Sequence, residues 1–236
     1  MQIELTHTHG QQINYLLYLP TETTENSHPL ILFLHGAGER GDDLSQLKKH
    51  GIPKIVDQDP NFPFIAVSPQ CSTESRWINR VGILKSLLDH VQAIYPVDSS
   101  RIYLTGLSMG GQGAWWLAAA YPDYFAAVVP ICGRTYTTSS TNSEIKSKGG
   151  WPLSALVEQT DRIKDLPLWV FHGAEDSVVP LQHSQEMVSA LKGLDSHVRF
   201  TIYPGVGHDS WTKTYDNPQL YQWLLQHHSS NSGQMK

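Results

Sequence analysis

Ser108 lies in a pattern that can present a serine hydroxyl as a nucleophile. The surrounding pentapeptide, Gly106-Leu107-Ser108-Met109-Gly110, separates an expected strand at 101–105 from an expected helix that begins at Met109. A serine at such a strand-turn-helix connection sits in a strained turn, and small glycine neighbours are needed to fit that turn. The context therefore predicts an activated hydroxyl suited to acyl transfer, with an ordinary glycine-rich turn as the alternative. A dinucleotide-binding turn is disfavoured, because Ser108 occupies the position of the second glycine of that motif.

A serine hydroxyl becomes a good nucleophile only when a base removes its proton and a third group orients that base. When the serine comes first along the chain, the acid and then the histidine follow it, each in a loop after a later strand. Asp176 follows an expected strand at 168–171, and the adjacent Glu175 is the alternative acid. His208 follows the last expected strand in a glycine-containing turn. We therefore expect Ser108, His208 and Asp176 to form a catalytic triad.

Acyl transfer also needs donors for the negatively charged oxygen of the tetrahedral intermediate, and backbone N–H groups serve this purpose. We expect one donor at Met109, directly after the serine, and a second in the glycine-rich segment 35–41, which follows another expected strand. Ala37 is the favoured position in that segment, and Gly38 is the alternative. Two His-Gly pairs at strand ends are expected to hold their loops by hydrogen bonding, through His35 and His172.

Three tryptophans near expected strand ends are candidates for lining a substrate pocket, although buried packing is an equally good interpretation: Trp77, Trp151 and Trp211. Trp115 and Trp116, on the helix after the serine, are expected in the core. Four histidines near the chain ends lack a cysteine or carboxylate at ligand spacing, so we expect no metal site and no cofactor there: His7, His9, His227 and His228.

The hydrophobic pattern predicts a sheet of mostly parallel strands. Alternating apolar residues at 2–7 and 12–19 suggest an antiparallel hairpin at the start of the chain. Continuous apolar runs then indicate buried strands at 30–34, 64–67, 102–105, 126–131, 168–171 and 198–203. Helical patterns separate these runs at 77–95, 109–121, 181–191 and 219–227. Strands that alternate with helices after an antiparallel start predict an α/β fold with helices on both faces of the sheet.

The chain is expected to form a single domain over 1–228. It has 236 residues, of which 40% are hydrophobic and 17% are charged, and this suits one globular domain with a sizeable core. The polar stretch 134–152 is interpreted as a surface insertion and not a linker, because hydrophobic patterning resumes directly after it and the remaining C-terminal piece is too short to fold alone. It is also too short to be a large cap domain. The last residues, 229–236, are expected to be a disordered tail.

Composition also limits the partners that the protein can have. The 17 Lys and Arg residues are outnumbered by 22 Asp and Glu residues, giving a net charge of -5, so no basic field attracts nucleic acid. The longest apolar runs fall far short of the roughly 20 residues that span a membrane. The first residues lack the basic and apolar regions of a signal peptide, so we expect a cytoplasmic protein.

With these residues in place, the sequence resembles the α/β-hydrolases, and within them bacterial carboxylesterases and predicted peptidases of the polyhydroxybutyrate-depolymerase-like and phospholipase/carboxylesterase types. The similarity extends over 30–211 and is densest over 98–113 and 121–133. It implies an α/β-hydrolase fold and a serine esterase without a cofactor, acting on small or short-chain acyl esters through the triad named above. A peptidase or thioesterase with the same triad is the alternative within enzymes, and a non-catalytic binding module is the alternative outside them.

One departure from these families concerns the residues after the expected strand at 126–131. Relatives often have Cys-Gly-Gly there, whereas this chain has Cys132-Gly133-Arg134, and Arg134 opens the insertion. Without a large cap, an open site is expected rather than a lipase lid. The two cysteines, Cys71 and Cys132, are expected to be small buried residues. The topology that the resemblance implies places two strands between those they follow, which argues against a disulfide.

Overall fold

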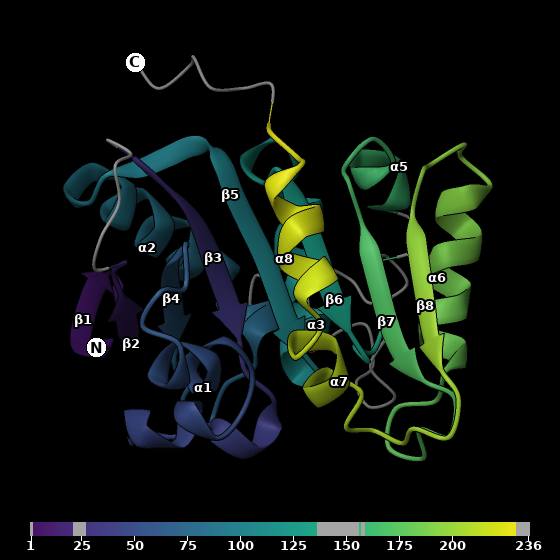
Figure 1. Ribbon diagram of the computed structural model, residues 1–236, viewed down its shortest axis with the longest axis horizontal. Coiled ribbons are helices and arrows are strands. Elements are labelled where there is room, and N and C mark those ends of the chain that lie inside the picture. Colours follow the sequence, from purple (N-terminus) through teal and green to yellow (C-terminus); the bar gives the residue numbers. More distant parts are fainter. Residues whose placement is uncertain (1, 21–26, 136–155, 157–158, 230–236) are drawn as a thin grey trace.

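A computed structural model describes residues 2–20, 27–135, 156 and 159–229. Within these residues, eight strands form one sheet in the order β1-β2-β4-β3-β5-β6-β7-β8. Their bounds are β1 (Gln2–His9), β2 (Gln11–Tyr18), β3 (His28–Leu34), β4 (Ile65–Pro69), β5 (Val97–Leu107), β6 (Ala127–Ile131), β7 (Trp169–Gly173) and β8 (Arg199–Tyr203). Figure 1 shows the sheet as a twisted layer between two layers of helices.

The directions of the strands match the prediction of a mostly parallel sheet with an antiparallel start. β1 and β2 form a hairpin that turns at Gly10, whose φ of 66° lies in the left-handed region that favours glycine. β2 pairs with β4 in the antiparallel sense, and the remaining pairs from β4 to β8 are parallel. The hairpin and the six later strands were all expected from the hydrophobic pattern, and this part of the prediction is confirmed.

Helices cover both faces of the sheet, because successive side chains of a strand point to opposite faces and both sets are apolar here. One face packs against α2 (Val81–Ile94), α3 (Met109–Ala120), α5 (Thr160–Ile163) and α6 (Gln182–Lys192). The other face packs against α1 (Gly51–Gln58), α7 (Trp211–Tyr215) and α8 (Pro218–Leu225). Four short 3-10 helices lie in the described connections: η1 (Ala37–Glu39), η2 (Leu44–Lys49), η3 (Trp77–Asn79) and η4 (Pro122–Tyr124).

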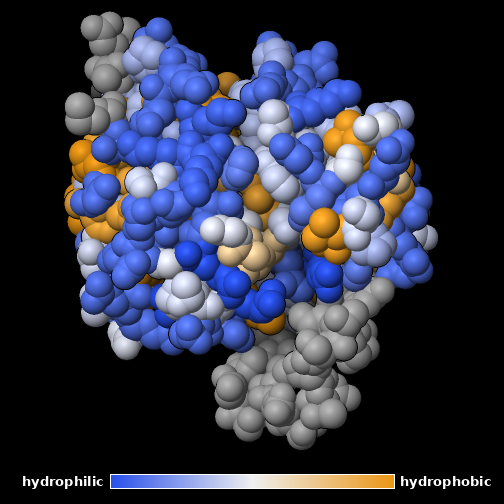
Figure 2. Space-filling model, turned by 90° about the horizontal axis from the view of Figure 1, so that it is seen from below, coloured by the Kyte–Doolittle hydropathy of each residue, from blue (hydrophilic) through white to orange (hydrophobic). Residues whose placement is uncertain are grey.

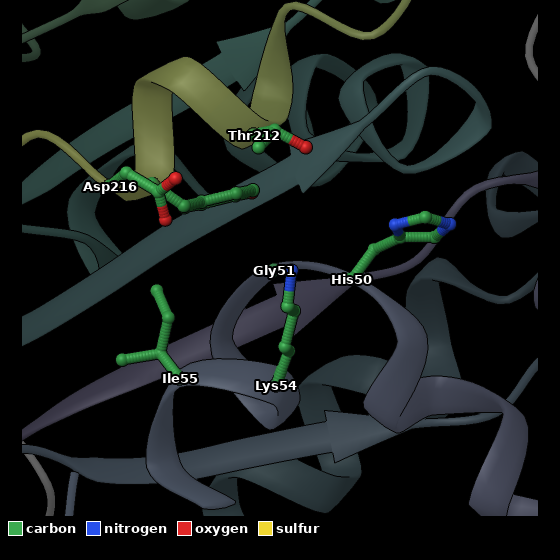
Figure 3. A pocket seen from close by; sticks show the side chains of 7 residues that line it. His50, Gly51, Lys54, Ile55, Thr212 and Asp216 are labelled. Atoms are coloured by element: carbon green, nitrogen blue, oxygen red, sulfur yellow. The ribbon is translucent and has the colours of Figure 1, made fainter. Parts of the chain in front are cut away.

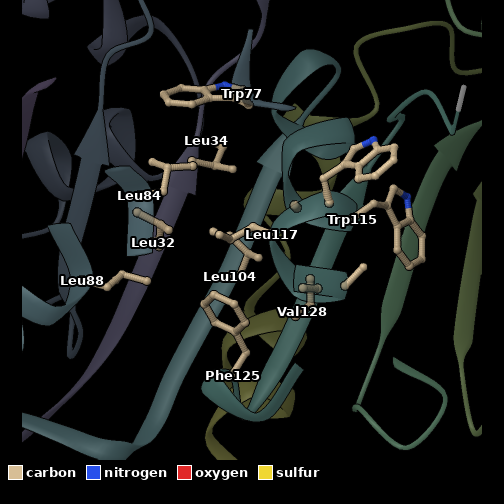
Figure 4. Packing of buried hydrophobic residues seen from close by; sticks show 14 of the residues in the cluster. Leu32, Leu34, Trp77, Leu84, Leu88, Leu104, Trp115, Leu117, Phe125 and Val128 are labelled. Carbon is tan, nitrogen blue, oxygen red and sulfur yellow. The ribbon is translucent and has the colours of Figure 1, made fainter. Parts of the chain in front are cut away.

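The larger core cluster surrounds α3, which is buried along almost its whole length. Figure 4 shows leucines of β3, β5 and α2 packed together beside this helix, with Trp77 at one end of the cluster and Phe125 at the other. Trp115 and Trp116 are buried, as expected. Small residues on α3 allow the close approach, since a Cβ at Gly113 would overlap the Trp77 side chain. The turn that precedes α3 is therefore held on a rigid base.

The structure differs from the sequence prediction in the first connections. The helix expected at 77–95 is divided at Arg80 into η3 and α2, and the helical residues of η2 and α1 were not predicted at all. In α1, Gly51 and Pro53 suggest a turn, yet Gly51 begins the helix with φ 63° beneath the Phe33 ring. Of the predicted insertion, only Arg134 and Thr135 lie within the described residues, and of the predicted tail only Ser229.

The two cysteines are free and buried. Cys71 follows β4 and Cys132 follows β6, and β3 and β5 stand between these strands, as the expected topology required. In the part of the chain that the structure describes, no helix has the length and apolar character needed to cross a membrane.

Candidate active site

The carboxyl ends of the central parallel strands lie side by side and carry the candidate residues. Leu34 at the end of β3 pairs with Gly106 of β5, and Leu107 pairs with Ile131 at the end of β6. β7 follows on the far side of β6. Loops that are far apart in the sequence therefore meet at this edge of the sheet, where ligands of open α/β sheets bind.

Ser108 occupies a strained turn between β5 and α3. Its φ of 53° and ψ of -112° lie outside the usual regions for a residue with a side chain. The turn requires glycine on both sides, because a Cβ at Gly106 would overlap Gly110 and a Cβ at Gly110 would overlap the Leu34 carbonyl. The Ser108 N–H donates a hydrogen bond of 2.9 Å to the carbonyl of Ile131, which fixes the turn to β6. This is the geometry that the pentapeptide predicted.

The His208 ring lies between Ser108 and Asp176. Its Nδ1 is 2.7 Å from Asp176 Oδ2, and its Nε2 is 2.9 Å from Ser108 Oγ. An ionised carboxylate only accepts hydrogen bonds, so Nδ1–H donates to Asp176 and the lone pair of Nε2 faces the serine hydroxyl. The structure thus brings together the three residues that the chain order singled out. The alternative acid, Glu175, is exposed.

Asp176 is held in place by three groups besides His208. Its Oδ1 accepts two hydrogen bonds of 2.9 Å from the N–H groups of Val178 and Val179. Its Oδ2 lies 3.1 Å from Nε2 of His172, which also donates to the Val179 carbonyl at 2.8 Å. The Asp176 side chain has no exposed surface. A carboxylate with this many donors has a single orientation, and that orientation is directed at His208.

His172 is itself fixed in the tautomer that this arrangement needs. Nε2 carries the proton, because a carbonyl oxygen can only accept, and Nδ1 then accepts from the Ser184 hydroxyl at 2.7 Å. Burial lowers the pKa of His172, so the ring stays neutral beside Asp176.

His35 orients the peptide group that would donate through Ala37. Its Nε2 accepts from the Cys71 N–H at 2.9 Å, so the ring proton resides on Nδ1 and is donated to the Gly36 carbonyl at 2.5 Å. The Gly36 carbonyl belongs to the same peptide plane as the Ala37 N–H, and the two groups point in opposite directions. Burial lowers the pKa of His35 to about 4, which keeps the ring neutral.

The rest of the loop after β3 is fastened to the segment after β4. Arg40 donates from Nε to the Ala37 carbonyl at 3.1 Å and from Nη1 to the Thr73 carbonyl at 2.9 Å. The Gln70 amide donates to the carbonyls of Glu39 and Asp43, both at 2.9 Å. The peptide groups on both sides of Ala37 therefore have their carbonyls held, which would preorganise the N–H groups that are expected to bind the oxyanion.

Met109, the other expected donor, is the first residue of α3. An N–H at this position has no acceptor within the helix and lies at the positive end of the helix dipole. It is therefore available to an oxygen atom bound near Ser108.

The three candidate pocket tryptophans lie in different surroundings. Trp77 is fully buried in the core, where its indole N–H donates to the His35 carbonyl at 2.9 Å, so the packing interpretation holds for it and it offers no surface to a substrate. Trp151 lies outside the described residues. Trp211 adjoins the triad, with its ring edge-on to His208 at a centroid distance of 5.2 Å.

A shallow recess lies beside Trp211, on the side of the molecule where α1 meets α7. It is small and partly open to solvent, and is lined by His50, Gly51, Lys54, Ile55, Thr212, Tyr215 and Asp216. Figure 3 shows these residues coming from two separate elements, with Lys54 and His50 on one side and Asp216 and Thr212 on the other. His50 contacts Trp211 at a ring distance of 5.8 Å, so the recess neighbours the site through these two rings.

The face at the carboxyl ends of the strands is mostly hydrophilic. Figure 2 views the molecule from this side and shows polar residues surrounding small, separate apolar areas. Among the residues next to the triad, Glu175 and Asp209 are exposed carboxylates, and Val178 is an exposed apolar side chain. An apolar surface of the size that binds lipid interfaces is not seen on the described part of this face.

Sequence reasoning missed the contribution of Arg40 and the position of Cys132. Arg40 acts through carbonyl oxygens, which every residue carries, so its partners leave no trace in residue types. Cys132 was expected only to be small and buried, and the structure places it beside the triad. Its signal in the sequence is that it directly follows the strand next to the one that carries Ser108.

Fold and site together define an α/β-hydrolase, a class of which several solved structures resemble this chain. A thermostable esterase is 29% identical, with a TM-score of 0.77 over 96% of this chain and 63% of that chain. A ferulic acid esterase shares the fold at 19% identity, with a TM-score of 0.70 over 95% of this chain and 96% of that chain. The family model of the prolyl oligopeptidases (Peptidase_S9) matches residues 84–231, and the chain belongs to this family.

Curated relatives extend this placement. Poly(3-hydroxyalkanoate) depolymerase C of Paucimonas lemoignei is 42% identical over 133 residues, which are 52% of this chain and 30% of that protein. Acyl-protein thioesterase 1 of Gibberella zeae is 33% identical over 126 residues, or 51% of this chain and 46% of that protein. Feruloyl esterase B of Thermothelomyces thermophilus is 25% identical over 88% of this chain and 80% of that protein. The chain thus matches less than half the length of the first two relatives.

Proposed function

We propose that this protein is a serine hydrolase that cleaves small or short-chain carboxylic esters through an acyl-enzyme intermediate. The observation that carries the proposal is the continuous chain of contacts from Asp176 through His208 to Ser108, at 2.7 and 2.9 Å. Three groups of matched type and order at these distances are what nucleophilic catalysis by serine requires. The strained turn at Ser108 supports the same role, because strain of this kind persists at functional sites.

In the proposed reaction, Ser108 Oγ attacks the ester carbonyl while Nε2 of His208 takes the hydroxyl proton. The oxygen that becomes negatively charged lies against the N–H groups of Ala37 and Met109. His208 then gives the proton to the departing alcohol, which leaves the acyl group on the serine. Water, activated by His208 in the same way, releases the acid and restores the enzyme. Asp176 keeps the imidazole in the required tautomer throughout.

A small ester is favoured by the surface around the site. The described rim is mostly polar, with exposed carboxylates at Glu175 and Asp209, and Val178 is an exposed apolar side chain on it. Long acyl chains need an extended apolar surface to leave water. No cofactor is needed for this chemistry, since the nucleophile, the base and the oxyanion donors all come from the chain.

A thioesterase or peptidase activity is the second candidate, because the chain belongs to a peptidase family and an acyl-protein thioesterase is among its relatives. Esters, thioesters and amides pass through the same type of tetrahedral intermediate, so a single triad can serve all three.

The experiment that tests the proposal is intact-mass analysis after treatment with a small fluorophosphonate, followed by peptide mapping. We expect one adduct, on Ser108, and none on Ser108→Ala. A panel of matched acetyl and butyryl esters, thioesters and aminoacyl amides then ranks the leaving groups, and esters should be turned over fastest. Folded protein that forms no adduct contradicts the proposal, and so does a Ser108→Ala variant that retains more than about a tenth of the wild-type rate.

A further inference from the structure

Cys132 lies against the triad, although acyl transfer does not need it. The residue follows β6 directly, is fully buried and has a φ of 41°, a value that side chains rarely adopt. Its N–H donates to the Phe171 carbonyl at 2.9 Å, which ties it to β7, the strand whose following loop carries Asp176. The position is thus fixed from both neighbouring strands, and the sulfur faces the loops that carry the acid and the histidine.

Three different ligand atoms converge at this point. The Cys132 sulfur, a carboxylate oxygen of Asp176 and a ring nitrogen of His208 all lie within 4.8 Å of one another, the one such group of three among the described residues. A second observation concerns Ser210, whose fully buried hydroxyl lies within hydrogen-bond reach of the Cys132 sulfur. The Ser210 oxygen has two lone pairs and therefore adds a fourth potential ligand atom beside the other three.

We propose that Cys132, Asp176 and His208 form an inhibitory binding site for a thiophilic divalent cation such as Zn²⁺ or Cd²⁺. A thiolate, an imidazole and a carboxylate are the three ligand types that Zn²⁺ takes in proteins, at about 2.3 Å for sulfur and about 2.0–2.2 Å for nitrogen and oxygen. A cation among the three atoms reaches these lengths when the side chains shift by about an ångström. Water or the Ser210 hydroxyl completes a tetrahedron.

Binding releases one proton, from the Cys132 thiol to solvent. Burial raises the pKa of this thiol to about 12, and the charges of Asp176 and Asp209 add to the effect, so without a cation the sulfur stays protonated and inert. The same carboxylates attract a dication. A thiolate bound to a metal ion is deprotonated outright, so the cation itself removes the obstacle.

The cation inhibits the enzyme whichever ring nitrogen of His208 it binds. This step rests on the proposed function. If Nε2 binds it, the lone pair that would take the Ser108 proton is occupied. If Nδ1 binds it, the ring proton moves to Nε2, and the lone pair is lost there as well. A neutral imidazole has one proton and one lone pair, for which the cation, Asp176 and Ser108 compete. In both cases Ser108 loses its base.

The test compares two single-cysteine variants, Cys132→Ser and its matched control Cys71→Ser, which removes the other buried free thiol. Inhibition by Zn²⁺ is followed with an acetyl ester, and binding of Cd²⁺ is followed separately by the ultraviolet charge-transfer band of a cadmium thiolate. We expect micromolar to submillimolar Zn²⁺ to inhibit the wild type and Cys71→Ser equally, with recovery on addition of EDTA. Cys132→Ser should need at least a tenfold higher Zn²⁺ concentration and should show no cadmium band.

Equal inhibition of the wild type and Cys132→Ser overturns the proposal, because the cation then acts without the sulfur. A wild type without a cadmium band overturns it as well. Cys132→Ala replaces the serine variant if that variant does not fold, and the cadmium spectrum of the wild type needs no variant at all. Failure of the proposed function looks different: the cadmium band depends on Cys132, but metal-free protein neither reacts with a fluorophosphonate nor cleaves esters.

Discussion

The His-Gly pair occurs at the end of two strands, and the two histidines act on different partners. At the end of β3, His35 donates to the carbonyl of the next residue and so orients a backbone N–H. At the end of β7, His172 contacts the carboxylate of Asp176, four residues further on. Both rings are buried, and burial lowers the pKa of each. One motif therefore provides a neutral, fixed imidazole, and the loop after it determines whether a peptide group or an acid is held.

We expect the largest loss of activity from a substitution in the loop after β7, where Asp176 contacts His208. Replacing Asp176 with Asn leaves the size unchanged but puts an amide where the imidazole needs an acceptor, so the wrong tautomer is favoured. We expect kcat to fall by about 10³- to 10⁴-fold while the protein stays folded. Steady-state kinetics on an acetyl ester and a thermal melt measure the two quantities.

Glu175→Gln is the matched control for this substitution. It removes the neighbouring carboxylate, which is exposed, and should change kcat by less than about twofold. A reversed pattern, with Glu175→Gln inactive and Asp176→Asn active, would show that the adjacent acid serves His208.

The next largest effect is on the free energy of unfolding and involves His35, at the end of β3. The ordinary pKa of a histidine is 6.5, and burial lowers that of His35 to about 4, helped by the positive charge of Arg40. The unfolded chain therefore takes up this proton at a higher pH than the folded chain. The contribution of His35 to the free energy of unfolding is complete above pH 6.5, falls as the pH drops from 6.5 to about 4 and changes no further below that, a loss of about 3 kcal/mol.

Urea unfolding of the wild type and of His35→Gln at pH 7 and pH 4.5 measures this contribution. The variant lacks the buried imidazole, so its free energy of unfolding should change less between the two pH values than that of the wild type. His172→Gln should reduce the pH dependence in the same direction, since burial lowers that pKa too. If His35→Gln keeps the full wild-type pH dependence, other groups cause the acid destabilisation, and the neutral form of His35 is not what stabilises this end.

The two strand ends also show how much of the fold and of the candidate site can be predicted from the sequence alone. The strands, the chain order Ser108, Asp176, His208 and the two His-Gly pairs follow from residue types and spacing, because apolar runs and strand ends are local features. The roles of the candidate pocket tryptophans do not follow from the sequence. Trp77 and Trp211 have similar positions near strand ends in the sequence but differ in the residues that pack against them. Arg40 has backbone carbonyls as partners, one of them 33 residues away, and a carbonyl carries no side-chain identity.

The smallest effect is a difference in kcat between substitutions of two arginines. Arg40 contacts the oxyanion loop, and Arg134 contacts the acid loop. Arg40 bridges two carbonyls with one planar guanidinium, one of them the Ala37 carbonyl in the oxyanion loop. Arg134 donates from Nη2 to the carbonyl of Val178 in the acid loop at 3.1 Å, its one carbonyl partner among the described residues. A lysine ammonium cannot reproduce the fixed fork of Arg40, so Arg40→Lys loosens the Ala37–Gly38 peptide, which directly follows the Ala37 N–H and carries the alternative donor, the Gly38 N–H. Asp176, in contrast, keeps all of its donors in Arg134→Lys, because the contact of Arg134 is with the Val178 carbonyl beside it.

We therefore expect Arg40→Lys to lower kcat by about 3- to 10-fold with little change in KM, the amount that one or two partly exposed hydrogen bonds contribute. Arg134→Lys should change kcat by less than about twofold. The split between kcat and KM carries the argument, because a preorganised oxyanion donor acts in the transition state and not on the bound ester. A rise in KM at constant kcat would place Arg40 in substrate binding instead. Equal losses of kcat in both variants would contradict this expectation. They would mean that catalysis depends on Arg40 in the oxyanion loop no more than on Arg134 at the acid loop.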